Sequence, residues 1–164
     1  MSRKESDIEH FIGLEAALIY LLSFRICKTR NEAIKYLRDR IPAEGVYQTE
    51  IKKFLESSCH GAFIWKAAAG PYSRGGIPDI NMVYNGKFYG FEVKRPYFGK
   101  ISQLQKETIE KINKAGGRAA VVTFPSEVAE IIMTSDAEWK GFIENHYKFL
   151  ERELKYSKNI PEGE

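Results

Sequence analysis

Two acids and a lysine in the middle of the chain have side chains that suit chemistry assisted by a metal ion. Asp79 follows a proline, and Glu92 and Lys94 stand two positions apart in the segment FEVKRP. Carboxylate oxygens are the ligands that Mg²⁺ and Mn²⁺ prefer, with the backbone carbonyl of Val93 as a third protein ligand. A divalent ion there polarises a phosphate oxygen and activates a water molecule, and Lys94 neutralises the developing charge. The outline is that of phosphodiester hydrolysis.

A tight turn predicts that the two acids converge. The dipeptide Asn85-Gly86 suits a two-residue type I′ hairpin loop, because both central residues of that turn need a positive φ. The register that follows sets Asp79 directly opposite Glu92, with Lys94 on the same face of the sheet. Like charges in such a pair are destabilising, so a shared cation would compensate for them. The alternative, a surface acid pair with Lys94 as its counter-ion, stays open here.

The flanking segments predict an α/β core around this hairpin. A helix from about 47 to 58 and a strand from 62 to 67 precede it, with a basic, glycine-rich loop at 70–76. After it, Ser102 and Gln105 form a capping box for a helix that ends at Gly116-Gly117, and an apolar strand follows. Strand, helix and strand in this order predict a right-handed crossover and a parallel pairing. We therefore expect a helix, a three-stranded antiparallel meander, a crossover helix and a parallel strand.

The ends of the chain predict additional helices. Ser6 is expected to cap a helix from about 7 to 25, and Thr29 a second one that ends before Pro42. Ser126 and Ser135 are expected to cap two more helices near the C-terminus. The first helix is apolar on most sides, so either this chain or a second copy has to cover it. We interpret the chain as one domain with an N-terminal extension (1–45), a core (46–125) and C-terminal helices with a tail (126–164).

Composition and charge narrow the class of protein. The longest apolar run, AALIYLL, is shorter than the roughly 20 residues of a membrane span, and we expect a cytoplasmic protein. Cys27 and Cys59 stand apart, which indicates neither a disulfide framework nor a zinc knuckle. The net charge is +3, but between Lys66 and Lys106 seven basic residues face two acids. A basic middle suits a polyanion such as nucleic acid, and a solvated charged surface is the alternative.

The motifs around the acids resemble a known family. GIPD followed by EVK resembles the PD-(D/E)xK nuclease signature, and SRGGIPD, FEVKRP, ISQLQ and AGG together are similar to its VRR-Nuc branch over about Tyr47 to Phe124. The Val-Arg-Arg tripeptide itself is absent, VKR at 93–95 being the nearest. The resemblance implies a restriction endonuclease-like fold, Mg²⁺- or Mn²⁺-dependent cleavage of DNA, selectivity for branched DNA such as Holliday junctions or flaps, and a homodimer.

The resemblance also assigns roles to residues. It implies metal binding by the two acids and catalysis by the lysine, with Gln105 near the site and Glu50 as the acid of the first core helix. Glu50 sits at the margin of the apolar stripe of that helix, so we expect it to reach inward. Gln105 could instead act only as the capping residue of its helix, so its role in the site and its role as a cap are both left open here. A catalytically silent nucleic-acid-binding module is the alternative function. The expected phosphate contacts are Lys66, Arg74, Arg95 and Lys100.

Overall fold

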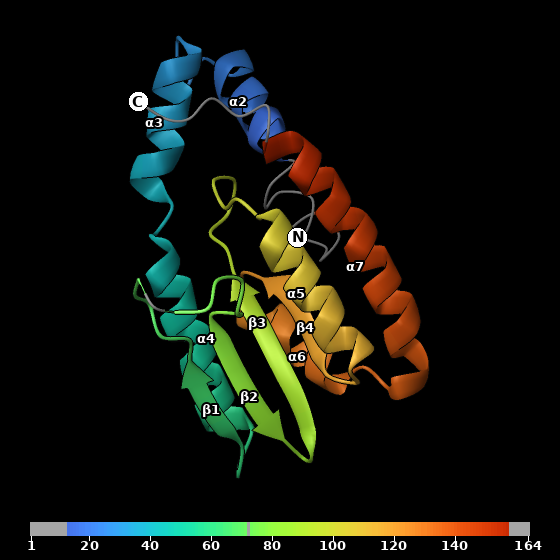
Figure 1. The fold of residues 1–164 in the computed structure, drawn as a ribbon. Coiled ribbons are helices and arrows are strands. Elements are labelled where there is room, and N and C mark those ends of the chain that lie inside the picture. Colours follow the sequence, from blue (N-terminus) through green and yellow to red (C-terminus); the bar gives the residue numbers. More distant parts are fainter. Residues whose placement is uncertain (1–12, 72, 158–164) are drawn as a thin grey trace.

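A four-stranded sheet forms the centre of the computed structural model, which describes residues 13–71 and 73–157 (Figure 1). The strands lie in the order β1-β2-β3-β4, the first three antiparallel and β4 parallel to β3. Helix α5 connects β3 to β4, so the predicted α/β architecture with its meander, crossover helix and parallel strand is confirmed. The strands are β1 (Phe63–Lys66), β2 (Ile80–Tyr84), β3 (Lys87–Val93) and β4 (Arg118–Val122). The helices are α2 (Gly13–Ser23), α3 (Arg30–Arg40), α4 (Glu44–Ser58), α5 (Gln103–Lys114), α6 (Pro125–Met133) and α7 (Asp136–Ser157).

The β2–β3 turn sets the register that the sequence predicts. Asn85 has φ 49° and Gly86 has φ 74°, so both central residues are in the left-handed region, as a type I′ turn requires. The ladder pairs Ile80 with Phe91 at its far end. One step beyond, the N–H of Val93 donates to Oδ2 of Asp79 at 2.8 Å, which continues the contact between the strands.

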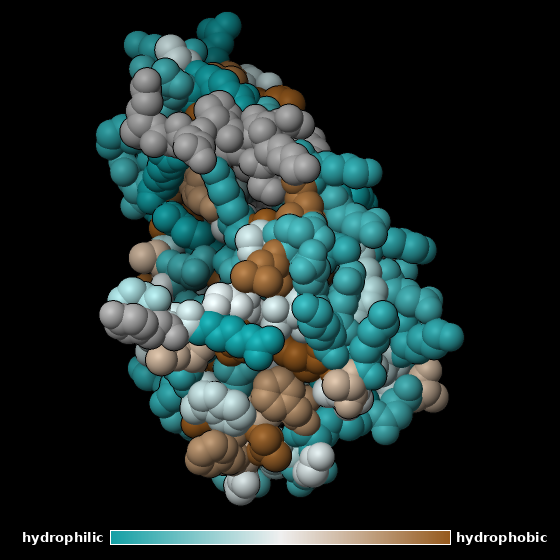
Figure 2. All heavy atoms as spheres, viewed as in Figure 1, coloured by the Kyte–Doolittle hydropathy of each residue, from teal (hydrophilic) through white to brown (hydrophobic). Residues whose placement is uncertain are grey.

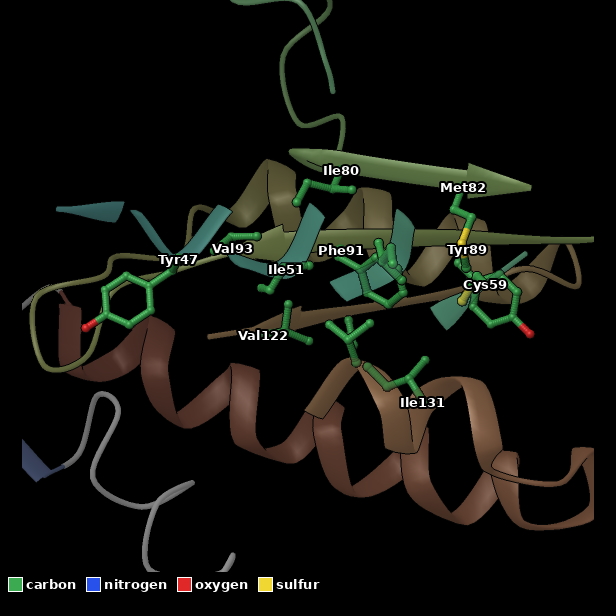
Figure 3. Close-up of a cluster of buried hydrophobic side chains, with 13 residues drawn as sticks. Tyr47, Ile51, Cys59, Ile80, Met82, Tyr89, Phe91, Val93, Val122 and Ile131 are labelled. Atoms are coloured by element: carbon green, nitrogen blue, oxygen red, sulfur yellow. The ribbon is translucent and has the colours of Figure 1, made fainter. Parts of the chain in front are cut away.

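The two faces of the sheet are covered by different helices. Helices α4 and α6 cover one face, where Ile51, Phe91 and Ile131 belong to the main apolar cluster (Figure 3). Helix α5 packs against β3 and β4 on the other face, with Ile109 in a second cluster. Because side chains alternate along a strand, Phe91 in the first cluster leaves Glu92 on the α5 face. The predicted separation of core and acidic faces is confirmed.

The crossover helix begins and ends where its sequence signals lie. The hydroxyl of Ser102 accepts the N–H of Gln105 at 3.1 Å, and the Gln105 side chain accepts the N–H of Ser102 at 2.8 Å, which is the predicted capping box. After Lys114 the chain turns through Gly116, whose φ of 91° favours glycine. These signals define where α5 begins and ends, and its first turn lies beside the carboxyl end of β3.

The helices near the C-terminus partly differ from the prediction. Ser135 does cap α7, since its Oγ accepts the N–H of Glu138 at 3.3 Å. The prediction for Ser126 is wrong, because α6 already begins at Pro125, and the Glu127 carboxylate accepts the N–H groups of Thr123 and Phe124 just before the helix. Proline at the first helical position lacks an N–H and has a helical φ, so it favours the earlier start.

The N-terminal helices form a pair on top of the core (Figure 1). Leu18 of α2 and Ala33 of α3 are fully buried in a third cluster, against which Tyr97 and Phe98 pack from the segment after β3. Thr29 caps α3 as predicted. The predicted cap at Ser6 lies outside the described residues. Among the helices that the structure describes, none combines the length and apolarity needed to cross a membrane.

Candidate active site

Asp79 is held at the start of β2 by hydrogen bonds to both neighbouring strands. Its side chain accepts the N–H of Val93 at 2.8 Å, and its carbonyl accepts the N–H of Ala67, just after β1, at 2.9 Å. The side chain is partly buried. Burial raises the pKa of Asp79, against the opposing effects of the Val93 N–H and of the Lys94 and Lys66 charges. The backbone thus positions this carboxylate before any ligand binds.

Glu92 is the most buried acid of the site, with 2% of its surface exposed. Its Oε1 lies 2.9 Å from Nζ of Lys94, which is also buried. The pKa of Glu92 is raised to about 7, mainly by burial; the charge of Lys94 opposes this rise, and the charges of Asp79 and Glu44 add to it. One lysine therefore faces three acids, and this excess of buried negative charge favours binding of a cation.

Gln105 serves the cap and the site at once. Its side-chain oxygen accepts the N–H of Ser102, while its side-chain nitrogen donates to Oε1 of Glu92. The two roles that the sequence sets against each other are compatible, because a primary amide carries an acceptor and a donor on separate atoms. Gln105 thus links the first turn of α5 to the acid on β3.

On the first core helix, Glu44 rather than Glu50 lies near the acid pair. Glu50 is exposed, so the prediction that it reaches inward is wrong. Glu44 is partly buried, accepts the backbone N–H of Arg95, and interacts with the charges of Asp79 and Lys94. Burial raises the pKa of Glu44. The sequence did not reveal it because the expected helix began at 47, whereas α4 begins with Glu44 itself.

The glycine-rich loop reaches the site through close backbone contacts. Gly76 has φ 81°, and a Cβ there would lie 2.8 Å from Cγ of Leu104 on α5. Pro78 lies over Gly90 of β3, where a Cβ would be 2.9 Å from the proline ring. The buried Asn81 donates to the carbonyl of Pro78 at 2.8 Å. These contacts lead the chain into Asp79, and Asn81 is a supporting residue that the sequence analysis missed.

The predicted phosphate contacts divide into two groups. Lys66, Arg74 and Lys100 are exposed. Arg95 differs, because its guanidinium donates to the carbonyl of Ile41 at 2.9 Å and lies over the Phe98 ring. Arg95 therefore ties the α3–α4 junction to the end of β3, and the structure does not support its predicted contact with phosphate.

The donor set fits a hard divalent cation bound by few protein ligands. Among residues 13–71 and 73–157, no three His, Cys, Asp or Glu side chains are grouped closely enough to share a metal ion. Mg²⁺ usually binds one or two carboxylates and keeps waters or substrate phosphates in its other positions. Asp79, which is partly buried, and Glu92, which is buried, meet that requirement, and the carbonyl of Val93 remains a predicted third ligand.

The comparisons with known proteins give one match. No family model matches the chain, and no curated protein matches it. Among solved structures, the chain is similar to one described as "VRR_NUC domain", with 27% sequence identity and a TM-score of 0.44. The match covers 54% of this chain and 92% of that chain. The family in that description is the one that the segments SRGGIPD, FEVKRP, ISQLQ and AGG resemble.

Proposed function

We propose that the protein is a metal-dependent DNA endonuclease that hydrolyses phosphodiester bonds, with selectivity for branched DNA. The observation that supports this function is the pairing of the buried Glu92 with the partly buried Asp79 beside Lys94. Burying like charges costs stability, and the apolar clusters on both faces of the sheet do not require it. Buried ionisable groups with perturbed pKa values gather at functional sites.

Each residue of the site has a role in this reaction. Mg²⁺ or Mn²⁺, when bound by Asp79 and Glu92, supplies Lewis acidity and an activated water. Lys94 places a positive charge where negative charge develops on the phosphoryl oxygens. Gln105 fixes the orientation of the Glu92 carboxylate through its hydrogen bond. Glu44 takes the place of Glu50 as the third acid and adds negative charge at the edge of the site.

A substrate panel tests the function. Purified protein is incubated with labelled flap, nicked, four-way and linear DNA in the presence of Mn²⁺. We expect cleavage of at least one substrate, with branched DNA preferred, and a loss of more than about a hundredfold for Asp79→Asn. Asp39→Asn, which changes an exposed acid on α3, is the matched control and should keep full activity. Absence of cleavage of all substrates, with Mn²⁺ bound, would contradict the proposal.

The same substrate panel distinguishes the alternative function from the proposed nuclease activity. A catalytically silent module binds DNA in a salt-dependent manner, turns over no substrate and is indifferent to Lys94→Ala. Melting with and without Mn²⁺ adds a readout that does not depend on activity, because a ligand that binds only the folded state raises its stability. Stabilisation of the wild type but not of Asp79→Asn is expected.

A further inference from the structure

Aromatic side chains line the sheet face that α5 leaves open. Phe63 on β1 is 69% exposed, and its ring centroid lies 5.4 Å from that of Trp65. Trp65 in turn lies 6.1 Å from Phe88 on β3. Val83, the strand partner of Phe63, is also exposed. Apolar side chains gather at this lower end of the molecule in Figure 2, over the hairpin end of the antiparallel strands. We call Phe63, Trp65 and Phe88 the aromatic row.

The aromatic row lies on the same sheet face as the acid pair. Trp65 is the partner of Asn81, and side chains two positions apart on a strand share a face, which places Trp65 on the side of Asp79. The Ala67–Asp79 hydrogen bond extends this pairing by one step. Diagonal neighbours across antiparallel strands are about 7–8 Å apart, so Trp65 begins the row beside the site.

The charges around the aromatic row favour a polyanion. Lys66 ends β1 and its charge interacts with Asp79, and Arg74 lies in the glycine-rich loop that leads to Asp79; both are exposed. In the part of the chain that the structure describes, neither forms an ion pair with a carboxylate. Exposed aromatic rings beside cations bind single-stranded nucleic acid, because bases stack on the rings while the cations contact the backbone.

We propose that Phe63 and Trp65 form a stacking platform for unpaired bases of the DNA strand that enters the site. This inference rests on the proposed function and adds to it that the substrate carries a single-stranded segment next to the cleaved bond. The bases stack on the rings, and the strand continues past Trp65 towards Asp79 and Glu92. Fully paired DNA offers no free base faces to the platform.

Fluorescence of Trp65 gives a direct readout of stacking. The chain has two tryptophans, so Trp139→Phe leaves Trp65 as the single reporter. The variant is titrated with an oligothymidylate of about ten nucleotides and with a blunt duplex, in EDTA to prevent cleavage. We expect the single strand to quench Trp65 and the duplex to leave it unchanged. An unchanged signal at saturating single strand would overturn the platform.

Variants of Phe63 distinguish stacking from simple apolar contact. Phe63→Leu removes the ring but keeps an apolar side chain, and we expect it to weaken single-strand binding roughly tenfold. Phe63→Tyr keeps the ring and the affinity. Met133→Ala changes another exposed apolar side chain, 82% exposed on α6, and should have no effect. The proposal would be overturned if Phe63→Leu bound single-stranded DNA as tightly as the wild type. It would also be overturned if sedimentation showed that the wild type is a dimer and that Phe63→Leu dissociates it.

The two proposals fail in different assays. If the protein cleaves a substrate but single-stranded DNA does not change the fluorescence of Trp65, the platform is overturned and the nuclease function stands. Quenching of Trp65 without cleavage of any DNA in Mn²⁺ overturns the nuclease function and leaves a single-strand-binding surface. Cleavage of a flap or a splayed end in preference to a blunt duplex, lost in Phe63→Leu, supports both.

Discussion

At the scale of single residues, hydrogen bonds set the positions of the charged side chains of the site. Three acids surround one lysine, and each acid is fixed by a different element: Asp79 by the N–H of Val93, Glu92 by Gln105, and Glu44 by the N–H of Arg95. These hydrogen bonds hold the carboxylates in position within the protein itself. Preorganisation of this kind lowers the cost of binding a metal ion and a phosphate.

Replacement of Gln105 should affect stability and activity together. Gln105→Ala removes the cap contact to Ser102 and the hydrogen bond to Glu92. We expect a loss of about 1 kcal/mol of stability from the cap and a lower kcat from the misplaced carboxylate. Gln103→Ala on the same turn, where the side chain contacts only Glu107, is the matched control for chemical denaturation and cleavage kinetics. A kcat equal to that of the wild type would remove Gln105 from the site.

The assignment of Glu44 instead of Glu50 as the third acid of the site can be tested directly. Glu44→Gln removes a charge that interacts with Asp79 and Lys94, whereas Glu50→Gln removes an exposed one on the same helix. We expect cleavage to fall at least about tenfold for Glu44→Gln and to stay unchanged for Glu50→Gln, measured under single-turnover conditions. The reverse order would restore the role that the sequence gives to Glu50.

At the scale of elements, turns and caps were predicted better than side-chain contacts between elements. Asn85-Gly86 fixed the hairpin register because its turn geometry is local, and Ser102 fixed the start of α5 for the same reason. Glu44 and the two contacts of Gln105 depend on how α4 and α5 pack against the sheet. Sequence patterns do not describe that packing, so only the structure reveals Glu44 and shows that Gln105 fills both of its predicted roles.

A histidine beside the edge strand β4 leads to a prediction about how the stability of the fold depends on pH. His146 of α7 accepts the N–H of Val121 at 3.0 Å, which satisfies a backbone donor on the edge strand. Burial lowers the pKa of His146 from 6.5 to about 4, so the folded protein holds it neutral while the unfolded chain binds a proton. Its stabilising contribution is complete above pH 6.5 and is lost as the pH falls towards 4.

Denaturant melts at several pH values measure this contribution. Because His146 as a whole residue is only half-buried, we expect a loss of about 2 kcal/mol between pH 7 and pH 4, less than the full pKa shift would give, and we expect this loss to be absent in His146→Gln. The amide of glutamine can still accept the N–H of Val121. His60→Gln, at an exposed histidine, is the control and should leave the pH dependence of the wild type unchanged. An identical slope for wild type and His146→Gln would contradict the assignment.

At the scale of the whole molecule, the helical pair α2–α3 gives a candidate surface for a second copy. Ile19, Tyr20 and Phe24 of this region are exposed, although Leu18 and Leu21 beside them are buried. An exposed apolar face of this kind is typical of an interface. We propose that two chains associate through α2, in line with the homodimer that the family resemblance implies.

Sedimentation velocity tests this association. We expect the wild type to sediment as a dimer and Tyr20→Glu as a monomer, because a buried unpaired charge is costly in an apolar interface. Met133→Glu, at an exposed apolar residue of α6, should leave the dimer intact. A wild type that remains a monomer at all concentrations would refute the α2 interface.

The hydrogen bonds of Asp79 to segments on both sides carry a consequence for the nascent chain. Asp79 acquires its position only when β1 and β3 have joined β2, and Glu92 acquires its amide partner only when α5 has docked. A newly synthesised or partly opened molecule therefore lacks this arrangement of the two acids. Under the proposed function, such a molecule would not cleave DNA, because catalysis would require the completed fold.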